Sequence, residues 1–485
     1  MTARIESGVE PPATRRRAGL LLPVGSLATP SFGASASEAL RFLEASGLSV
    51  WQVLPLGPTH PDNSPYQCLS SFALEPSYLD ETRLLDDPGF EATASAGDRR
   101  QGRGATGELQ ADFAGFRQRE GHWVEDYARF VAIREEQDQR GWLDWPAGLR
   151  DREPEAMQAF ERLHAGRIDA IVFEQFLLER QWQALRREAS ARSVVLFGDL
   201  PIFVAGDSAD VWANRELFQL NSNGQPDVVA GVPPDYFSAT GQRWGNPLFD
   251  FERMAEDEFA WWQRRLDRHL ALYDWVRIDH FRGIAGYWAI PAESPDATEG
   301  QWVPGPGASL LKALQAVGGG KLPLVAEDLG LITDDVTELR DRFGLPGMVV
   351  LQFAFDGDES NPHLPTHHRP ASVVYTGTHD NDTTLGWWHS LDAAMRARVQ
   401  RWLEAMQEID SATPMPEALV ESALASRANL AMLPVADLLG LGSEARINVP
   451  GTSDGNWCWR LNEDVLSSDL AERVHERLRR HKRLA

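Results

Sequence analysis

Acidic side chains stand at the ends of four apolar runs of this chain, and two of them have surroundings that tune their charge. Arg277 and Asp279 are two residues apart, so on a β-strand both side chains point to the same face. A fixed cation beside a carboxylate favours the ionised form, which a nucleophile needs. Glu327 instead follows the apolar run 324–326. Loss of hydration there raises a carboxyl pKa and favours the protonated form of a general acid.

A pair of carboxyl groups whose pKa values are pushed apart is typical of enzymes that cleave glycosidic bonds. Asp380, within 378–382, adds a third acid that can accept hydrogen bonds from sugar hydroxyls in the transition state. Asp199 ends the fourth run. The residue types and their order therefore predict glycoside chemistry, with Asp279 as nucleophile and Glu327 as proton donor.

Simpler interpretations of these residues stay open. The Arg277–Asp279 pair could be a structural ion pair, and an Asp at a strand end is more often a helix cap or loop ligand. Asp328 and Asp382 are interpreted in that way, and His280 as a buried histidine with satisfied hydrogen bonds. A metal site is disfavoured because the chain has no HxH or HExxH motif, and adjacent strand residues face opposite sides. We expect no metal and no cofactor.

Eight apolar runs, separated by helical patterns, predict the elements that position these residues. Runs 20–27 and 50–56 flank a helical stripe at 36–43, a βαβ pattern that indicates parallel strands. The other six runs are 194–197, 275–278, 322–326, 348–355, 372–376 and 445–449. We expect an α/β protein with a single (β/α)8 barrel over residues 1–485, because such barrels carry catalytic groups at the C-terminal ends of their strands.

Two stretches do not fit this repeat. Residues from about 85 to 167 are polar and partly helical, and residues from about 205 to 249 are rich in Pro, Gly and Asn. We expect both to be insertions that form subdomains around the catalytic mouth, the second as an active-site loop or lid. Segments 64–67 and 231–247 carry aromatic and amide side chains that suit an oligosaccharide. The role of the polar part near 92–121 is not predicted.

Composition narrows the partners and the compartment. The 485 residues carry a net charge of -24 at pH 7, which repels phosphates and anionic lipid, so we expect neither nucleic acid nor membrane as a partner. Only two cysteines occur, far apart, which fits a reducing cytoplasm. Residues 15–23 imitate an export signal, but Pro23 interrupts their short apolar run, and we interpret them as a buried first strand.

The motifs that hold the acids resemble the 4-α-glucanotransferases called amylomaltases or disproportionating enzymes, which are barrel relatives of the α-amylases. The resemblance covers nearly the whole chain. It rests on residues 22–27, 198–204, 231–247, 276–282, 326–330, 375–384 and 448–459. One departure is Ala205-Gly206, where the family usually has a larger side chain.

The resemblance implies a role for each matching position. Asp279 would be the nucleophile, Glu327 the general acid/base and Asp380 the stabiliser of the transition state. Arg277, His379 and Asp199 would surround the donor sugar at the cleavage point. The remaining positions that it implies along the glucan groove are Ser64, Tyr66, Gln242, Trp244, Asp356 and Asn448.

The expected activity is a retaining transfer of part of an α-1,4-glucan or maltooligosaccharide donor to the 4-hydroxyl of glucose or another maltodextrin. The nearest alternative is an α-1,4-glucan hydrolase that uses the same three acids, and only the resemblance favours transfer over hydrolysis. A non-catalytic maltodextrin-binding protein is a weaker alternative, because the three acids are all present. A metal-dependent barrel hydrolase ranks below both.

Overall fold

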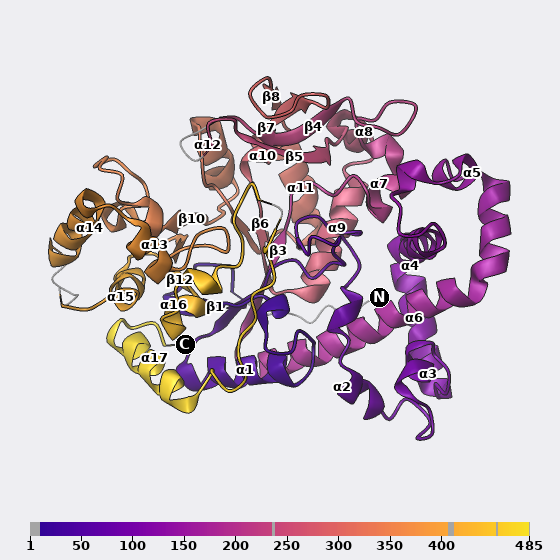
Figure 1. The fold of residues 1–485 in the computed structure, drawn as a ribbon, viewed down its shortest axis with the longest axis horizontal. Coiled ribbons are helices and arrows are strands. Elements are labelled where there is room, and N and C mark those ends of the chain that lie inside the picture. The colour runs from indigo at the N-terminus through magenta and orange to yellow at the C-terminus, as the bar shows by residue number, and fades with distance from the viewer. Residues whose placement is uncertain (1–9, 235–237, 406–411, 453, 485) are drawn as a thin grey trace.

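A ring of parallel strands lies at the centre of the computed structural model, which describes residues 10–234, 238–405, 412–452 and 454–484 (Figure 1). The strands pair in the order β10-β11-β12-β1-β2-β3-β6-β9. The Ala326 N–H donates to the Pro346 carbonyl, just before β10, at 2.9 Å, which brings the two ends of the sheet together. The predicted (β/α)8 barrel is confirmed. Its strands are β1 (Arg17–Leu21), β2 (Val50–Gln52), β3 (Val195–Leu200), β6 (Trp275–Ile278), β9 (Leu324–Ala326), β10 (Gly347–Val350), β11 (Ser372–Tyr375) and β12 (Leu430–Pro434).

Seven of the eight predicted runs overlap a barrel strand, and the eighth prediction is wrong. Residues 445–449 form no strand: Ser443–Ala445 is a 3-10 turn that leads into a loop. The last strand is β12, which lies between β11 and β1. Residues 430–433 are buried on both faces of the sheet, so their run has no polar alternation, and periodicity does not separate it from a buried helix.

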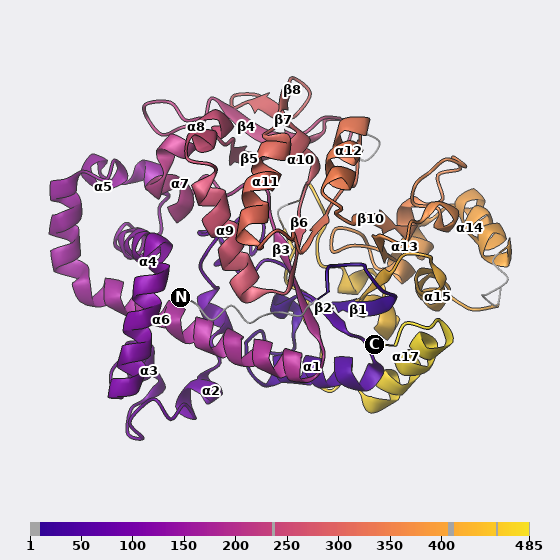
Figure 2. The same ribbon diagram turned by 180° about the vertical axis from the view of Figure 1, so that it is seen from behind.

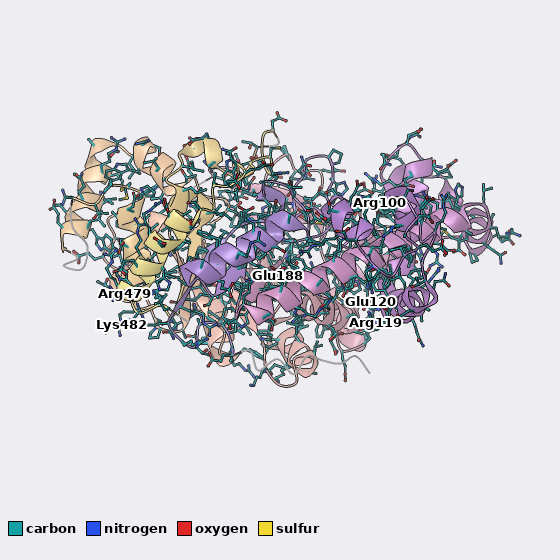
Figure 3. All side chains as sticks on the ribbon, turned by 90° about the horizontal axis from the view of Figure 1, so that it is seen from below. Arg100, Arg119, Glu120, Glu188, Arg479 and Lys482 are labelled. Atoms are coloured by element: carbon teal, nitrogen blue, oxygen red, sulfur yellow. The ribbon has the colours of Figure 1, made fainter. Side chains whose placement is uncertain are left out.

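Helices enclose the ring and bury its outer surface. The principal ones are α1 (Ala34–Ser46), α6 (Pro154–Ala191), α9 (Ala260–Leu272), α11 (Gly307–Val317), α12 (Asp334–Arg342), α15 (Glu417–Ala425) and α17 (Ser468–Arg480). Figure 3 views α1, α6 and α17 from outside. Glu188, labelled there on α6, accepts a hydrogen bond from Ser37 of α1 at 2.7 Å. Inside the ring, Phe197, Trp275 and Met432 belong to a separate buried cluster.

The polar stretch between β2 and β3 folds as helices on one side of the barrel. They are α2 (Glu81–Leu85), α3 (Ala96–Arg100), α4 (Gly107–Glu136), α5 (Ala147–Arg150) and the first part of α6. Figures 1 and 2 show α4 and α6 as a projecting unit in purple. The rings of Phe113 and Phe173 lie 4.9 Å apart at their contact, so this stretch has an apolar interior of its own despite its polar composition.

The stretch 205–249 is more regular than the expected loop or lid. It holds two strands, β4 (Val228–Val232) and β5 (Gln242–Pro247), which pair with β7 (Gly286–Pro291) and β8 (Gln301–Pro304) in an antiparallel sheet of order β5-β4-β7-β8. Residues 235–237 lie outside the described residues. β4 pairs with the distant β7, for example Gly231 opposite Trp288, and β5 pairs with β4; the local sequence does not reveal these partners.

The remaining helices complete the connections: α7 (Ala209–Ala213), α8 (Phe251–Glu256), α10 (Arg282–Ala285), α13 (Thr384–Ser390), α14 (Ala393–Ala405) and α16 (Val435–Leu439). Both ends of the described chain meet the barrel. The indole N–H of Trp275 donates to the Glu10 carbonyl at 2.8 Å, and the buried Arg483 donates to the Arg17 carbonyl at 3.0 Å. Within the described part of the chain, no helix is both long and apolar enough to cross a lipid bilayer.

Candidate active site

Arg277 joins two aspartates at the C-terminal ends of β3 and β6. In the sheet register Asp199 lies opposite Arg277, so both enter the barrel mouth at one level. One terminal nitrogen of Arg277 lies 2.6 Å from Asp199 Oδ2, and the other lies 2.8 Å from Asp279 Oδ1. Burial alone would lower the pKa of Arg277, but the two aspartates raise it well above its ordinary value. A permanent cation therefore touches the half-buried carboxylate of Asp279.

Asp199 is fully buried and supports this arrangement. Besides Arg277, the hydroxyl of Tyr66 donates to its Oδ2 at 2.8 Å. Burial raises the pKa of Asp199, and the attraction of Arg277 opposes that rise. Its Oδ1 has no hydrogen-bond partner among the described residues. A buried carboxylate oxygen without a partner is costly unless something else completes it, and sugar hydroxyls are donors of the right kind.

Glu327 follows β9 and is buried, with 7% of its surface exposed. Its Oε2 accepts the His280 N–H at 2.6 Å, and its Oε1 accepts the Leu329 N–H at 2.9 Å. His280 has φ 51°, in the left-handed region, at the turn that follows Asp279. Burial raises the pKa of Glu327 to about 8; the charge of Asp279 adds to the rise, and Arg277 and the two amides oppose it.

The third acid, Asp380, is held from two sides in the loop after β11. Asn448 donates to its Oδ1 at 2.6 Å, and His379 Nε2 lies 3.3 Å from its Oδ2. Arg446 donates to the Asp380 carbonyl at 3.0 Å and to the Asn448 carbonyl at 2.7 Å. The segment 446–448, wrongly predicted as a strand, therefore positions Asp380. Arg446 was not among the predicted residues.

Aromatic rings line the site next to Asp199. The ring of Tyr66 stacks on His379 with centroids 5.1 Å apart and planes 16° apart. Trp457 closes the group, 5.8 Å from Tyr66 and 5.9 Å from His379. Ser64 shapes the turn that carries Tyr66, since its hydroxyl accepts the Tyr66 N–H at 3.4 Å. Trp457 was not singled out from the sequence; its φ of 62°, rare for such a side chain, is visible only in the fold.

Strand β5 carries two predicted residues, Gln242 and Trp244, and Trp244 contacts His280, whose N–H binds Glu327. Trp244 meets His280 edge to face at 4.8 Å, and its indole N–H donates to Gln242 Oε1 at 3.1 Å. The interpretation of His280 as a satisfied buried histidine is wrong. Its Nε2 is buried without a partner among the described residues, and burial lowers its pKa to about 4. A neutral imidazole therefore faces Trp244.

Three acids near the site have local roles. Asp356 is exposed and accepts the Asp358 N–H of its own loop; within the described residues it has no hydrogen bond to the other predicted site residues. Asp328 pairs with Arg340 and accepts the Met348 N–H at 2.7 Å, which fixes the start of β10. Asp382 accepts the hydroxyl of Ser443 at 2.7 Å. The structural interpretation of Asp328 and Asp382 agrees with these contacts.

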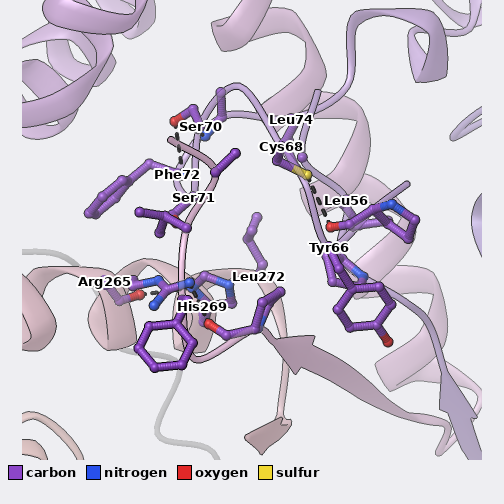
Figure 4. A pocket seen from close by; sticks show the side chains of 18 of the residues that line it. Leu56, Tyr66, Cys68, Ser70, Ser71, Phe72, Leu74, Arg265, His269 and Leu272 are labelled. Carbon is purple, nitrogen blue, oxygen red and sulfur yellow. Dashed lines mark hydrogen bonds between the residues drawn. The ribbon is translucent and has the colours of Figure 1, made fainter. Parts of the chain in front are cut away.

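A small cavity lies behind Tyr66, between the segment 65–74 and α9 (Figure 4). Cys68, Arg265 and His269 line it. Its volume of about 40 Å³ holds only a few water molecules. The ring of Tyr66 thus separates this cavity from Asp199, and the cavity is too small for a sugar. Among the described residues no group of three or more His, Cys, Asp or Glu side chains is arranged to hold a metal ion.

Comparison with known proteins agrees with this geometry. The sequence profile of the 4-alpha-glucanotransferases matches residues 22–102 and 90–466. The 4-alpha-glucanotransferase of Thermus thermophilus is 46% identical over 95% of this chain and 97% of the relative. The chloroplastic/amyloplastic 4-alpha-glucanotransferase DPE1 of Arabidopsis thaliana is 42% identical over 97% of this chain and 86% of the relative.

A solved structure shares the whole fold. The amylomaltase from Streptococcus agalactiae in complex with acarbose superposes with a TM-score of 0.90 at 29% identity, covering 97% of this chain and 100% of that one. The profile match and the two relatives each span most of the sequence that forms the barrel and the acidic site. The chain therefore belongs to the 4-alpha-glucanotransferase family.

Proposed function

We propose that this enzyme moves a segment of an α-1,4-glucan to the 4-hydroxyl of glucose or a maltodextrin, with retention at the anomeric carbon. The observation that carries the proposal is the contrast between two carboxyl groups at one barrel mouth, one in contact with a cation and one buried. Arg277 lies 2.8 Å from Asp279 Oδ1 and orients this side chain as the nucleophile. Burial keeps Glu327 protonated near neutral pH, since its pKa is about 8.

The steps follow from these two surroundings. Asp279 attacks the anomeric carbon while Glu327 gives its proton to the departing glycosidic oxygen, and a covalent glycosyl-enzyme forms. The ionised Glu327 then takes the proton of the incoming 4-hydroxyl, whose oxygen displaces Asp279 and restores an α-1,4 bond. One glycosidic bond is broken and one is made, so no external energy source is needed.

The surrounding side chains hold the sugar during these steps. Asp199 and Arg277 face the donor unit, and Asp380 accepts hydrogen bonds that tighten as positive charge develops on the ring. Tyr66 and His379 supply a stacked aromatic edge. Ser64 and Asn448 act by positioning Tyr66 and Asp380.

Transfer also needs water to stay out while the acceptor arrives. Gln242 and Trp244 of β5 cover His280 beside the acid/base, and we assign them to that exclusion. The subdomain formed by 205–249 acts as a cover of fixed strands, and the chain works as one catalytic barrel domain with its insertions. Asp356 has an exposed position that suits an outer part of the groove.

Incubation with maltotriose tests the proposal. Transfer yields glucose together with a ladder of longer oligomers, whereas a hydrolase yields only shorter products. Glu327→Gln removes the proton donor and should abolish turnover while maltotriose still binds. The matched control is Glu472→Gln on the outer surface of α17, which should leave the ladder unchanged. Normal turnover by Glu327→Gln would overturn the assigned roles.

Two further parts of the proposal concern the need for a metal or cofactor and the location of the enzyme in the cell. No step above needs a metal or a cofactor, so dialysis against a chelator should leave the maltotriose rate unchanged. We also propose a cytoplasmic location, because both cysteines of the chain, Cys68 and Cys458, are unpaired thiols. Cell fractionation with an antibody to the enzyme tests that location.

A further inference from the structure

Trp302 differs from every other tryptophan of the chain in its exposure. All 17 tryptophans fall within the described residues, and Trp302 is the most exposed of them, with 38% of its surface open to solvent. It lies on β8, the edge strand of the four-stranded sheet, which Figure 1 shows next to β7 at the top of the molecule. Exposed aromatic area on a soluble protein is costly and marks a binding surface more often than a single exposed aliphatic residue does.

The ring of Trp302 is held from below and from the side. The guanidinium carbon of Arg282 lies 3.8 Å from its ring centroid, so the cation stacks on one face. Trp288, directly opposite on β7, meets it at 5.2 Å with planes 67° apart. Trp288 is itself fixed, because its indole N–H donates to the Ala297 carbonyl at 2.9 Å. Trp302 is therefore a flat apolar surface on a rigid base.

The base of this surface is a buried cation. Arg282 is buried, and within the described residues its only hydrogen bond runs from NH1 to the Thr333 hydroxyl at 2.9 Å. Its Nε is buried without a partner, and no carboxylate of the described residues lies within ion-pair distance of it. The indole N–H of Trp302 also has no partner in the described part of the chain. A fixed apolar ring face with one unused indole N–H at its edge is a surface on which a sugar ring stacks while a hydroxyl meets the N–H.

The surface is continuous with the active site. Arg282 opens α10, two residues after His280, whose N–H binds the Glu327 carboxyl. The Phe281 N–H donates to the Glu327 carbonyl at 3.0 Å, so α10 is fixed to the acid/base. Thr333 comes from the loop after β9, six residues beyond Glu327. The two segments that carry Asp279 and Glu327 therefore also carry the support of Trp302.

Charge separates the possible occupants. Asp334 and Asp335 are exposed beside Thr333, and the chain has a net charge of -24, so an anionic ligand is repelled. A neutral polyol has no such penalty. We propose that Trp302, supported by Arg282 and Trp288, is an accessory platform that binds a stretch of a long α-glucan outside the groove of the catalytic acids. The inference rests on the proposed function, which makes such a polymer the substrate.

The test compares a short and a long glucan on protein that cannot turn them over. In a Glu327→Gln background, affinity is measured for maltotriose by calorimetry and for soluble amylose by retardation in native gels. Trp302→Ala should weaken amylose binding about tenfold, the order of one lost aromatic stack, and leave maltotriose binding within about twofold. Trp302→Phe, which keeps an apolar ring, should lose less. Leu163→Ala, an exposed apolar residue of α6, is the matched control and should change neither affinity.

The outcomes separate the platform from the proposed function. Equal amylose affinity in the parent and in Trp302→Ala overturns the platform alone. An equal loss for both sugars also overturns it, because Trp302 would then act on the main groove or on folding. A parent that binds neither sugar overturns the proposed function and the platform with it. A thermal unfolding midpoint equal to that of the parent shows that Trp302→Ala is folded.

Discussion

The raised pKa of Glu327 has a consequence for stability that is independent of any activity assay. An ordinary glutamate has a pKa of 4.5, whereas burial raises that of Glu327 to about 8. Below pH 4.5 this carboxyl group is protonated in both the folded and the unfolded protein, so its ionisation does not change the free energy of unfolding. Between pH 4.5 and about 8, Glu327 ionises in the unfolded chain but stays protonated in the folded protein. The free energy of unfolding therefore falls as the pH rises through this range.

The size of this effect follows from the two pKa values. Each pH unit in that window costs the folded state about 1.4 kcal/mol, which amounts to about 3 kcal/mol at pH 7 and about 4 kcal/mol at pH 8, where the folded group is half ionised. Glu327→Gln cannot ionise and escapes this cost. It loses one of the two amide hydrogen bonds, since its own NH2 group meets a backbone N–H, at a pH-independent cost of about 1–2 kcal/mol.

The assay is urea unfolding of both proteins at pH 5, 6, 7 and 8, followed by tryptophan fluorescence. We expect Glu327→Gln to be slightly less stable than the parent at pH 5 and clearly more stable at pH 8, with no turnover at either. The parent should also lose activity above about pH 8, as Glu327 loses its proton. A stability difference that does not change with pH, or that falls as the pH rises, would refute the assignment of a buried, protonated Glu327.

Three further changes test other contacts. Tyr66→Phe removes the hydroxyl that donates to Asp199 Oδ2 at 2.8 Å, and should lower kcat/KM for maltotriose about tenfold with thermal stability nearly unchanged; unchanged kinetics would show that the contact is idle. Asn448→Ala frees one side of Asp380 and should lower kcat about tenfold, with a smaller effect on maltotriose affinity measured by calorimetry. Arg483→Met deletes donors to six backbone carbonyls of residues 17 and 423–429, and should destabilise the fold by at least about 3 kcal/mol in urea, while the folded protein keeps its normal specific activity.

The sequence predicts the barrel and the pairing of its acids because both depend on local signals. Parallel buried strands read as apolar runs, and a catalytic group at a strand end stands directly after its run, as Asp279 and Glu327 do. The alternation rule also places Arg277 on the side of Asp279, and the structure joins them at 2.8 Å.

Other parts of the site depend on contacts between distant segments, which one sequence does not contain. The stack of Tyr66, His379 and Trp457 joins three loops that meet only when the barrel closes. The left-handed turn at His280 carries no glycine or asparagine that would signal it. β4 is a short apolar run, VVAGV, but nothing in it indicates that it pairs with the distant β7 in an antiparallel sheet.

The later part of the polar insertion, beyond the stretch 92–121, contacts the loops next to the site. Arg134 of α4 pairs with Asp207 at 2.5 Å, and the Trp142 N–H donates to the same carboxylate at 3.1 Å. The Trp142 indole donates to the Gly206 carbonyl at 2.8 Å. The departure at Gly206 is therefore harmless, because the contact uses the backbone, and a Cβ there would meet only Pro247 at an ordinary 3.6 Å.

The segment held by the insertion in turn holds the loop of Tyr66. The Ala209 N–H donates to the Leu69 carbonyl at 2.8 Å, and Asp210 accepts the Ser71 N–H at 2.7 Å. Contacts thus run from α4 through residues 206–210 to residues 69–71, and from there along the chain to the hydroxyl that meets Asp199. A surface loop alone would leave Tyr66 free to move by more than a hydrogen bond tolerates. The insertion is thus linked to the loop of Tyr66 through these hydrogen bonds, although none of its side chains contacts the three acids.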